Sequence, residues 1–280
     1  MKWCARELAN VEVCLRHAHE LGMHDLVWQV PAALQGFFNL SKRVAAQYST
    51  HALGLTAARE CGSAEGIALM HLGISAAQRF WKNDGQAIDD GLEALEGFRA
   101  LKNRRFEGIV LSNVAMSYVY IGWFGKAYEF FAESLAAAQE VGDRHAEAWA
   151  LTNLGAAQRR DGLLDDSLSA LRRAAEIRTA IDDLDGEAWT RAELGRTCSD
   201  LGLSDAAEAA FERSIALHLA HGNTYGHARA LDQLGSHFER TGQHDRAREV
   251  WEEALPLFTA LRGSDAARLR LNLARLGPAR

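Results

Sequence analysis

The sequence is short of residues that interrupt helices and of residues that favour strands. It contains 3 prolines in 280 residues, and 18 valines and isoleucines together, against 49 alanines. Proline breaks helices, β-branched residues favour strands, and alanine is the strongest helix former. This composition predicts a nearly all-helical protein, and a hydrophobic content of 48% excludes a disordered chain.

Positive charge and long apolar runs are also lacking. The chain carries 31 lysines and arginines against 37 aspartates and glutamates, a formal net charge of −6. Because it has no overall basic field, direct binding to nucleic acid or to an anionic membrane is disfavoured. No apolar run approaches the ~18 residues that span a bilayer, and the first residues are already charged. We therefore expect a cytoplasmic protein.

Cysteine is scarce and widely spaced. The four residues, Cys4, Cys14, Cys61 and Cys198, contain no Cys-x-x-Cys motif. Such spacing suits neither a disulfide framework nor a zinc knuckle. We interpret the four as reduced thiols that mostly pack in the interior.

The sequence repeats with a period of 40 residues. A Leu-Gly pair recurs at 154–155, 194–195 and 234–235, Val114-Ala115 takes its place one period earlier, and a glycine follows seven residues after each pair. A second small residue follows twelve residues after the first, and a bulky one four residues later still. Small residues let two helices approach closely and bulky ones fill the space between them, so the period predicts stacked helix pairs. The recurring residues are the glycines Gly122, Gly162, Gly202 and Gly242, the small residues Ala127, Ser167, Ala207 and Ala247, and the bulky residues Phe131, Leu171, Phe211 and Trp251.

Two earlier units fit this pattern less well. Leu72-Gly73 opens one of them, and Ala87 is displaced by two residues through a longer turn at 81–85. The first unit, at 25–61, is degenerate, and Pro31 should kink or interrupt its first helix.

The order of Leu-Gly, turn glycine, alanine and phenylalanine resembles the tetratricopeptide repeat over residues 25–276. The resemblance implies an all-α, right-handed superhelical solenoid of about six helix pairs whose first helices line a concave groove. The usual period is ~34, and we attribute the longer one to a second helix that runs about two turns further.

The period sets the expected boundaries. We expect a junction helix within 1–24, the solenoid at 25–264, and a capping helix with its tail at 265–280, where Arg268 and Arg275 should face water. The expected helices are 3–21, then the pairs 25–40/43–60, 64–80/85–101, 105–121/124–140, 145–161/164–181, 185–201/204–220 and 225–241/244–261, and finally 265–276.

The amino-terminal stretch carries a second resemblance. A tryptophan helix with Glu7-x-x-Asn10, then Leu21-Gly22-Met23-His24-Asp25-Leu26-Val27-Trp28, is similar to the junction between an NB-ARC ATPase module and its repeats. That junction occurs in bacterial transcription regulators of the antibiotic-regulatory-protein type, which are signal-transduction ATPases. The resemblance covers residues 3–60, and Val27 replaces the common alanine. It implies a carboxy-terminal sensor segment of a larger regulator. The chain has no Gly-x-x-x-x-Gly-Lys-Ser/Thr loop, so it cannot hydrolyse nucleotide through a P-loop.

The repeat phase places two amides and two tryptophans on the concave face. Repeats of this class often hold an asparagine at the positions of Asn113 and Asn153, where an amide can donate to and accept from a bound peptide backbone. The alternative is that these amides bond to a neighbouring helix or to water. Trp149 and Trp189 recur one period apart, and we favour packing against the preceding helix over an aromatic wall for a ligand.

Four arginines share the concave register: Arg160, Arg196, Arg229 and Arg240. Guanidinium groups pair with carboxylate or phosphate, but Glu193, Asp200 and Glu239 lie in the same register, which favours mutual ion pairs. The resulting candidate groove consists of Asn113, Tyr120, Trp149, Asn153, Arg160, Trp189, Arg196, Gln233 and Arg240.

Sets of residues for metal binding or catalysis are not evident. His218 and His221 stand three residues apart and His17 and His19 two apart, but no acid or cysteine completes either set at a ligand spacing. No Ser-His-Asp or Cys-His arrangement is found, and Cys198 occupies a packing position. We therefore expect no metal, no cofactor and no enzyme activity.

These observations lead to an interaction and sensor module. We expect its groove to bind a peptide segment, a partner domain such as an adjoining ATPase module, or a small inducer, and so to control a multidomain transcription regulator. The alternative is a free-standing peptide receptor or structural adaptor. An aromatic cluster at the start of the stack could also support a homodimer; it consists of Trp28, Phe37, Phe38 and Tyr48.

Overall fold

The computed structural model describes residues 2–41, 43–261 and 265–276. Within these ranges the chain forms fifteen helices and no strand, as the composition predicted. None of the described helices is both long and apolar enough to cross a membrane. The chain divides into two compact units, Met1–Ala150 and Leu151–Arg280.

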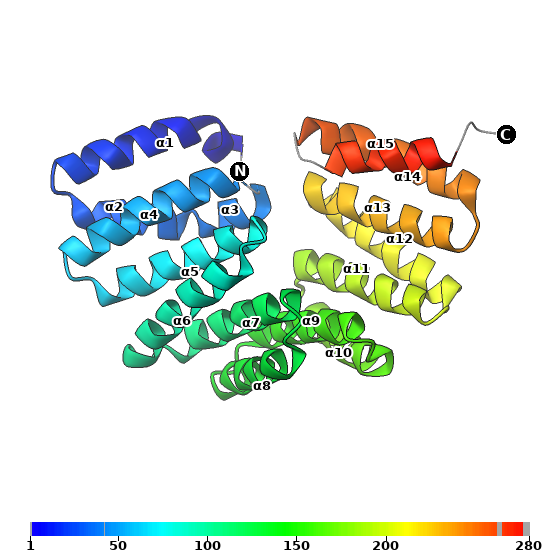
Figure 1. Cartoon of the computed structure of the whole chain (residues 1–280), viewed down its shortest axis with the longest axis horizontal. Coiled ribbons are helices and arrows are strands. Elements are labelled where there is room, and N and C mark those ends of the chain that lie inside the picture. Colours follow the sequence, from blue (N-terminus) through cyan, green and yellow to red (C-terminus); the bar gives the residue numbers. More distant parts are fainter. Residues whose placement is uncertain (1, 42, 262–264, 277–280) are drawn as a thin grey trace. The chain divides into compact units, whose positions relative to one another are not determined.

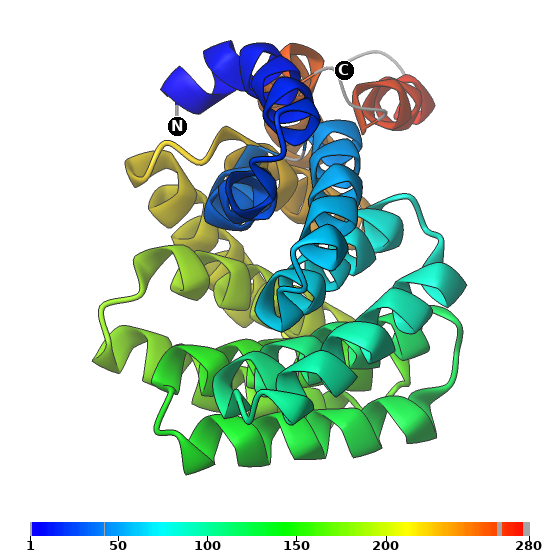
Figure 2. The same ribbon diagram turned by 90° about the vertical axis from the view of Figure 1, so that its left-hand side faces the viewer.

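The first unit is built from helices that pack mainly on the next helix in the chain. They run from blue to green in Figure 1, and α1 lies against α2 and α4 at one end of the unit (Figure 2). The helices are α1 (Lys2–Glu20), α2 (His24–Ala33), α3 (Gln35–Ser41), α4 (Val44–Glu60), α5 (Ala64–Phe80), α6 (Asp84–Ala100), α7 (Arg104–Tyr120) and α8 (Phe124–Glu140), followed by α9 (Arg144–Arg160), which continues into the second unit.

The second unit continues the same arrangement, in the order α10 to α15 (Figure 1). Its helices after α9 are α10 (Leu164–Ala180), α11 (Leu184–Asp200), α12 (Ser204–Ala220), α13 (Thr224–Arg240), α14 (His244–Ala260) and α15 (Asp265–Arg275). The predicted helix pairs are therefore confirmed, with boundaries within about two residues for all but the first pair.

Two details of the predicted register were wrong. Every helix from α4 to α14 has 17 residues, so the second helix of a pair is no longer than the first, and the long period is shared between both. Ala87 is not displaced. It follows Ser75 by the usual twelve residues, so Ser75 and not Gly73 holds the first small position of this unit. Ser75 Oγ donates 2.6 Å to the carbonyl of Ala87, much as Ser167 Oγ donates 2.7 Å to that of Gly155.

A turn occurs every 20 residues, and one residue in each turn has a left-handed backbone conformation. The predicted turn glycines adopt it, among them Gly162 with φ of 85°. Lys82, Lys102 and Asp182 hold equivalent positions with φ of 59°, 55° and 52°. Non-glycine residues pay a steric cost there. The geometry of the turn is therefore set by the stacking of the helices and not by glycine alone.

Side-chain caps alternate along the chain. The first helix of each regular pair has an N-cap side chain that accepts a hydrogen bond from the backbone N–H three residues later, whereas the second helix has none at this position. Such a cap satisfies one of the free N–H groups of the first turn. The capping residues are Ser63, Asn103, Asp143, Asp183 and Asn223.

The predicted small-and-bulky packing is confirmed in both units. The bulky residues Phe131, Leu171, Phe211 and Trp251 are at most 1% exposed. A Cβ atom on Gly195 would lie 2.8 Å from the ring of Phe211, so the absence of a side chain there lets the two helices approach.

The start of the chain departs from the regular pairs. Pro31 lies near the end of α2, which stops at Ala33, and α3 begins at Gln35, as the proline predicted. Phe37 and Phe38 are buried together with Leu8 of α1, so these two rings are not available for the homodimer contact suggested for the aromatic cluster.

The four cysteines form no disulfide. Cys198 is buried among the apolar residues of the second unit, as predicted, and burial raises its pKa. Cys14 and Cys61 are exposed, so the interpretation as packing thiols was wrong for these two.

Candidate functional site

The second unit contains a groove of about 600 Å³. Residues of α9, α11, α13 and α15 provide most of its charged lining, so the first helices of the pairs line it here as the repeat predicted. Its charged residues are the arginines Arg159, Arg196, Arg229, Arg240 and Arg268 and the aspartates Asp200, Asp232 and Asp265.

Most of these arginines are held by acids inside the same unit. Asp200 accepts hydrogen bonds from Arg159 at 2.8 Å and from Arg240 at 2.6 Å. Glu193 accepts from Arg196 at 3.0 Å, and Arg229 lies 4.0 Å from the same carboxylate. The predicted mutual ion pairing is therefore confirmed for the groove.

The capping helix also joins this network. Arg268 of α15 donates to Asp232 at 2.6 Å, and Arg275 donates to Glu239 at 3.2 Å. Glu239 thus pairs outside the predicted set of groove arginines. Both arginines of α15 are exposed, as expected, with side chains 48% and 65% accessible, and each also reaches an acid on α13.

The two acids that hold these arginines, Glu193 and Asp200, are stabilised in their charged forms. Burial works to raise the pKa of the Glu193 carboxyl, but three guanidinium groups outweigh it and hold the pKa below its usual value. They belong to Arg196, Arg229 and Arg159. Burial likewise works to raise the pKa of Asp200, and hydrogen bonds from Arg159 and Arg240 lower it overall. These two carboxyl groups are therefore ionised at neutral pH.

A serine and a histidine extend the groove beside Asp200. Ser199 Oγ lies 2.5 Å from His237 Nδ1 and also bonds to Arg240. Burial, followed by the charge of Arg240, lowers the pKa of His237. This imidazole is therefore neutral at physiological pH and adds no charge to the groove.

Three polar atoms on groove residues have no hydrogen-bond partner within the described part of the chain, and all three are sheltered from solvent. They are Gln233 Oε1, an acceptor, Arg159 Nε, a donor, and His237 Nε2. Sheltered polar atoms are normally bonded. A ligand that offers one donor and one acceptor could therefore satisfy the glutamine oxygen and the guanidinium nitrogen.

Some of the predicted groove residues lie together in the groove of the second unit, and others lie elsewhere. Arg196, Gln233 and Arg240 line the groove together. Trp189 is half-buried beside it, with its ring 4.8 Å from that of His218 and 5.6 Å from the guanidinium carbon of Arg229.

The other predicted positions do not line this groove. Asn153 is half-buried and Arg160 is exposed. In the first unit, Asn113 is half-buried, Tyr120 is 48% exposed and Trp149 is 38% exposed. More than half of the Trp149 surface is therefore covered.

Sequence reasoning missed Arg159, His237 and Arg268. Arg159 directly precedes the predicted Arg160 and lies about 100° from it around the helix, and this half-buried neighbour lines the groove although its repeat position differs from that of Asp200 and Arg240. Arg268 lies outside the repeats, where the period gives no register.

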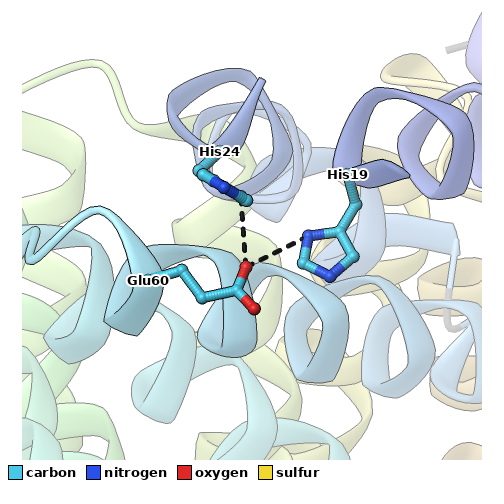
Figure 3. Close-up of side chains that lie close together, drawn as sticks. All are labelled: His19, His24 and Glu60. Atoms are coloured by element: carbon cyan, nitrogen blue, oxygen red, sulfur yellow. Dashed lines mark ion pairs between the residues drawn. The ribbon is translucent and has the colours of Figure 1, made fainter. Parts of the chain in front are cut away.

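The histidines that lie close together in the sequence differ in their surroundings. His218 is buried while His221 is exposed, and His17 faces Glu20 at 3.3 Å. His19 instead meets His24 and Glu60, which come from two other helices (Figure 3). Local spacing could not reveal this group, because Glu60 lies about 40 residues further along the chain.

A sequence model of the tetratricopeptide repeat family matches residues 106–180 and 154–220. Residues 106–220 are tetratricopeptide repeats. The helices on either side of this stretch continue its 20-residue spacing from α4 to α14. No curated protein matches the chain by sequence.

Solved structures share the fold. A Rap protein complexed with competence and sporulation factor is 14% identical, with a TM-score of 0.70 over 99% of this chain and 80% of that chain. PlcR from Bacillus thuringiensis, in complex with the peptide PapR7 and DNA, is 15% identical, with a TM-score of 0.61 over 70% of this chain and 71% of that chain. At such identity the likeness shows the fold alone.

A larger protein also contains this fold. It is a signal transduction ATPase with numerous domains from Pyrococcus horikoshii that has a tetratricopeptide repeat sensor. The identity is 14% and the TM-score 0.69, over 93% of this chain. The present chain spans 39% of the length of that protein.

Proposed function

We propose that this chain is a non-catalytic interaction module that binds an extended peptide segment in the groove of its second unit. The observation that carries the proposal is the unmatched pair of Gln233 Oε1 and Arg159 Nε. Each non-proline residue of a peptide backbone offers one N–H and one C=O. An extended segment would therefore donate to the glutamine oxygen and accept from the guanidinium nitrogen.

The charge of the groove favours a polar segment with an acidic group. Five arginines and three aspartates line it, so the positive charges are in excess even when the carboxylate of Glu193 is added. The existing ion pairs hold the guanidinium groups in place before a ligand arrives, which lowers the entropy lost on binding. An acidic side chain or a carboxyl terminus of the peptide would approach Arg229, whose contact with Glu193 is long at 4.0 Å.

Proteins with this fold support the proposal. PlcR is a tetratricopeptide-fold neighbour that is solved in complex with a peptide. The amino-terminal resemblance to the NB-ARC junction and the likeness to the sensor of the multidomain ATPase further support a role as sensor of a transcription regulator in the cytoplasm. The bound segment would then be a stretch of a partner domain, a signalling peptide or a small inducer that mimics one.

The test is selection from a displayed library of random twelve-residue peptides on the immobilised chain, followed by titration of the selected peptides. We expect binders whose affinity falls at least tenfold in Gln233→Ala and in Arg159→Ala, because each change removes one backbone contact. Gln243→Ala is the matched control, since this amide lies outside the groove and bonds to Thr241 and Arg246. A library without binders, or binders that are indifferent to both groove changes, would overturn the proposal.

A second candidate is a free-standing peptide receptor. The observation that favours it is the match to the Rap protein, of which 80% of the chain is covered, against 39% of the multidomain ATPase. The reading frame of the gene decides between the two, because a frame that continues upstream into a P-loop ATPase excludes the free-standing receptor.

A further inference from the structure

Three potential metal ligands converge in the first unit. His19 lies in the last turn of α1, His24 is the first residue of α2, and Glu60 is the last residue of α4. Figure 3 shows both rings turned toward the same carboxylate, whose Oε2 lies 3.5 Å from His19 Nδ1 and 3.1 Å from His24 Nδ1. The three ligand atoms all lie within 4.8 Å of one another.

The polar atoms of this group are not satisfied by hydrogen bonds. Both Nδ1 atoms are sheltered from solvent, and neither forms a hydrogen bond within the described part of the chain, in spite of their closeness to the carboxylate. The rings stand edge to face, with centroids 5.5 Å apart. The nitrogens are therefore gathered around a common point without a hydrogen bond to hold them there, which is the arrangement of a ligand set.

The distances suit a small divalent ion. Zinc binds histidine nitrogen and carboxylate oxygen at about 2.0–2.2 Å, so neighbouring ligands in a tetrahedral site lie about 3.3–3.6 Å apart. The two distances to Glu60 fall close to this range. Two imidazoles and one carboxylate favour zinc or a similar transition metal over magnesium or calcium, which take mostly oxygen ligands.

From this geometry we propose that His19, His24 and Glu60 form a zinc site that fastens α1 and α2 to α4. The side chains are 25%, 29% and 45% exposed, so an ion can enter from solvent and a water molecule can take the fourth position. Each ligand comes from a different helix end, and the site therefore adds a link between three elements that also pack through apolar residues such as Ala18, Val27 and Ala57.

The first experiment is calorimetric titration of the full chain with zinc chloride after removal of metals by a chelator. We expect one ion per chain with a dissociation constant in the micromolar range or below. Glu60→Gln and His24→Gln should each weaken binding at least tenfold, because each removes one ligand. His17→Gln is the matched control, since His17 lies on the same helix but is 69% exposed and outside the group.

The second experiment separates a metal site from a simple ion pair. Zinc should raise the melting temperature of the chain and of His17→Gln by several degrees, and should leave that of Glu60→Gln unchanged, because only a bound ion stabilises the folded form by mass action. Cobalt should give the visible absorption of a tetrahedral site in the same two proteins only. If Glu60→Gln lowers the melting temperature without metal and zinc has no effect on any of the proteins, the group is an ion pair and the proposal is wrong.

Discussion

Arg240 donates a hydrogen bond of 2.6 Å to Asp200, which lies 40 residues, or one repeat, earlier in the chain. Arg159, which lies 41 residues before Asp200, donates to the other oxygen of the same carboxylate at 2.8 Å. One acid therefore joins three consecutive first helices of the second unit, α9, α11 and α13. The contact fixes the positions of guanidinium groups that line the groove.

The first prediction concerns this carboxylate. Asp200→Asn keeps the shape of the side chain but removes the charge that both arginines share, and we expect it to lower the free energy of unfolding by about 1–3 kcal/mol. Urea denaturation at pH 7.5 measures the change. Glu133→Gln breaks the pair with Arg99, in which both side chains are about half exposed, and should cost less than about 1 kcal/mol. Equal losses in the two variants would show that Asp200 has no special structural role.

The second prediction concerns the close approach of two helices. Gly195→Ala places a Cβ atom 2.8 Å from the ring of Phe211, which is 1% exposed and has no room to move aside. We expect a loss of about 1–3 kcal/mol in the free energy of unfolding. Gly125→Ala is the control, because no atom lies within 4 Å of its added Cβ. It should stabilise α8 by about 0.5–1 kcal/mol, since alanine is the better helix former.

The fold could be predicted from the sequence because the period fixes the phase of every helix. Gly155, Gly195 and Gly235 lie one period apart, and each faces the bulky residue of the next helix. A shift of one residue in any of these helices would have broken this regular spacing in the sequence. The small position was assigned to the wrong residue only in the unit of Ser75, where serine holds the position that glycine holds in the last three repeats. Serine takes this role because its hydroxyl bonds to the carbonyl of Ala87 and leaves no unsatisfied polar atom.

The candidate site was only partly predictable. The repeat period predicted Arg196, Gln233 and Arg240 as groove residues, and these three line the groove together. It could not give Arg268, because this residue lies on α15 beyond the last repeat and reaches Asp232 only through the packing of the final helix. Contacts between helices that do not share the repeat register leave no local signal in the sequence, and Glu60 with its two histidines is a second example.

The third prediction concerns the left-handed turn positions. Lys102 has φ of 55°, a conformation in which the Cβ atom crowds the backbone, so Lys102→Gly should raise the free energy of unfolding by about 0.5–1 kcal/mol. Gly162→Ala at the equivalent turn should lower it by about 1 kcal/mol, although its surroundings are open. Thermal and urea denaturation of both variants give the signs. A loss of stability in Lys102→Gly would mean that the lysine side chain makes a contact worth more than the relief of strain.

The fourth prediction concerns stability in mild acid. Burial lowers the pKa of His51 and of His218 from 6.5 to about 4. The unfolded chain therefore binds more protons than the folded chain between these values, and the stability present above pH 6.5 is lost as the pH falls toward 4. Each histidine contributes a loss of about 2 kcal/mol at pH 5, since one pKa unit corresponds to about 1.4 kcal/mol. Urea denaturation at pH 7.5 and pH 5.0 measures it.

A substitution isolates one of the two histidines. Neither ring nitrogen of His218 forms a hydrogen bond within the described part of the chain, so His218→Leu should cost little at pH 7.5. It should also reduce the loss of stability between pH 7.5 and pH 5.0 by about 2 kcal/mol, because leucine takes up no proton in the unfolded chain. His221→Leu, at an exposed position nearby, should leave the loss unchanged. The same pH dependence in His218→Leu and in the unaltered chain would mean that His218 is protonated in the folded protein at pH 5, and that its burial does not depress its pKa.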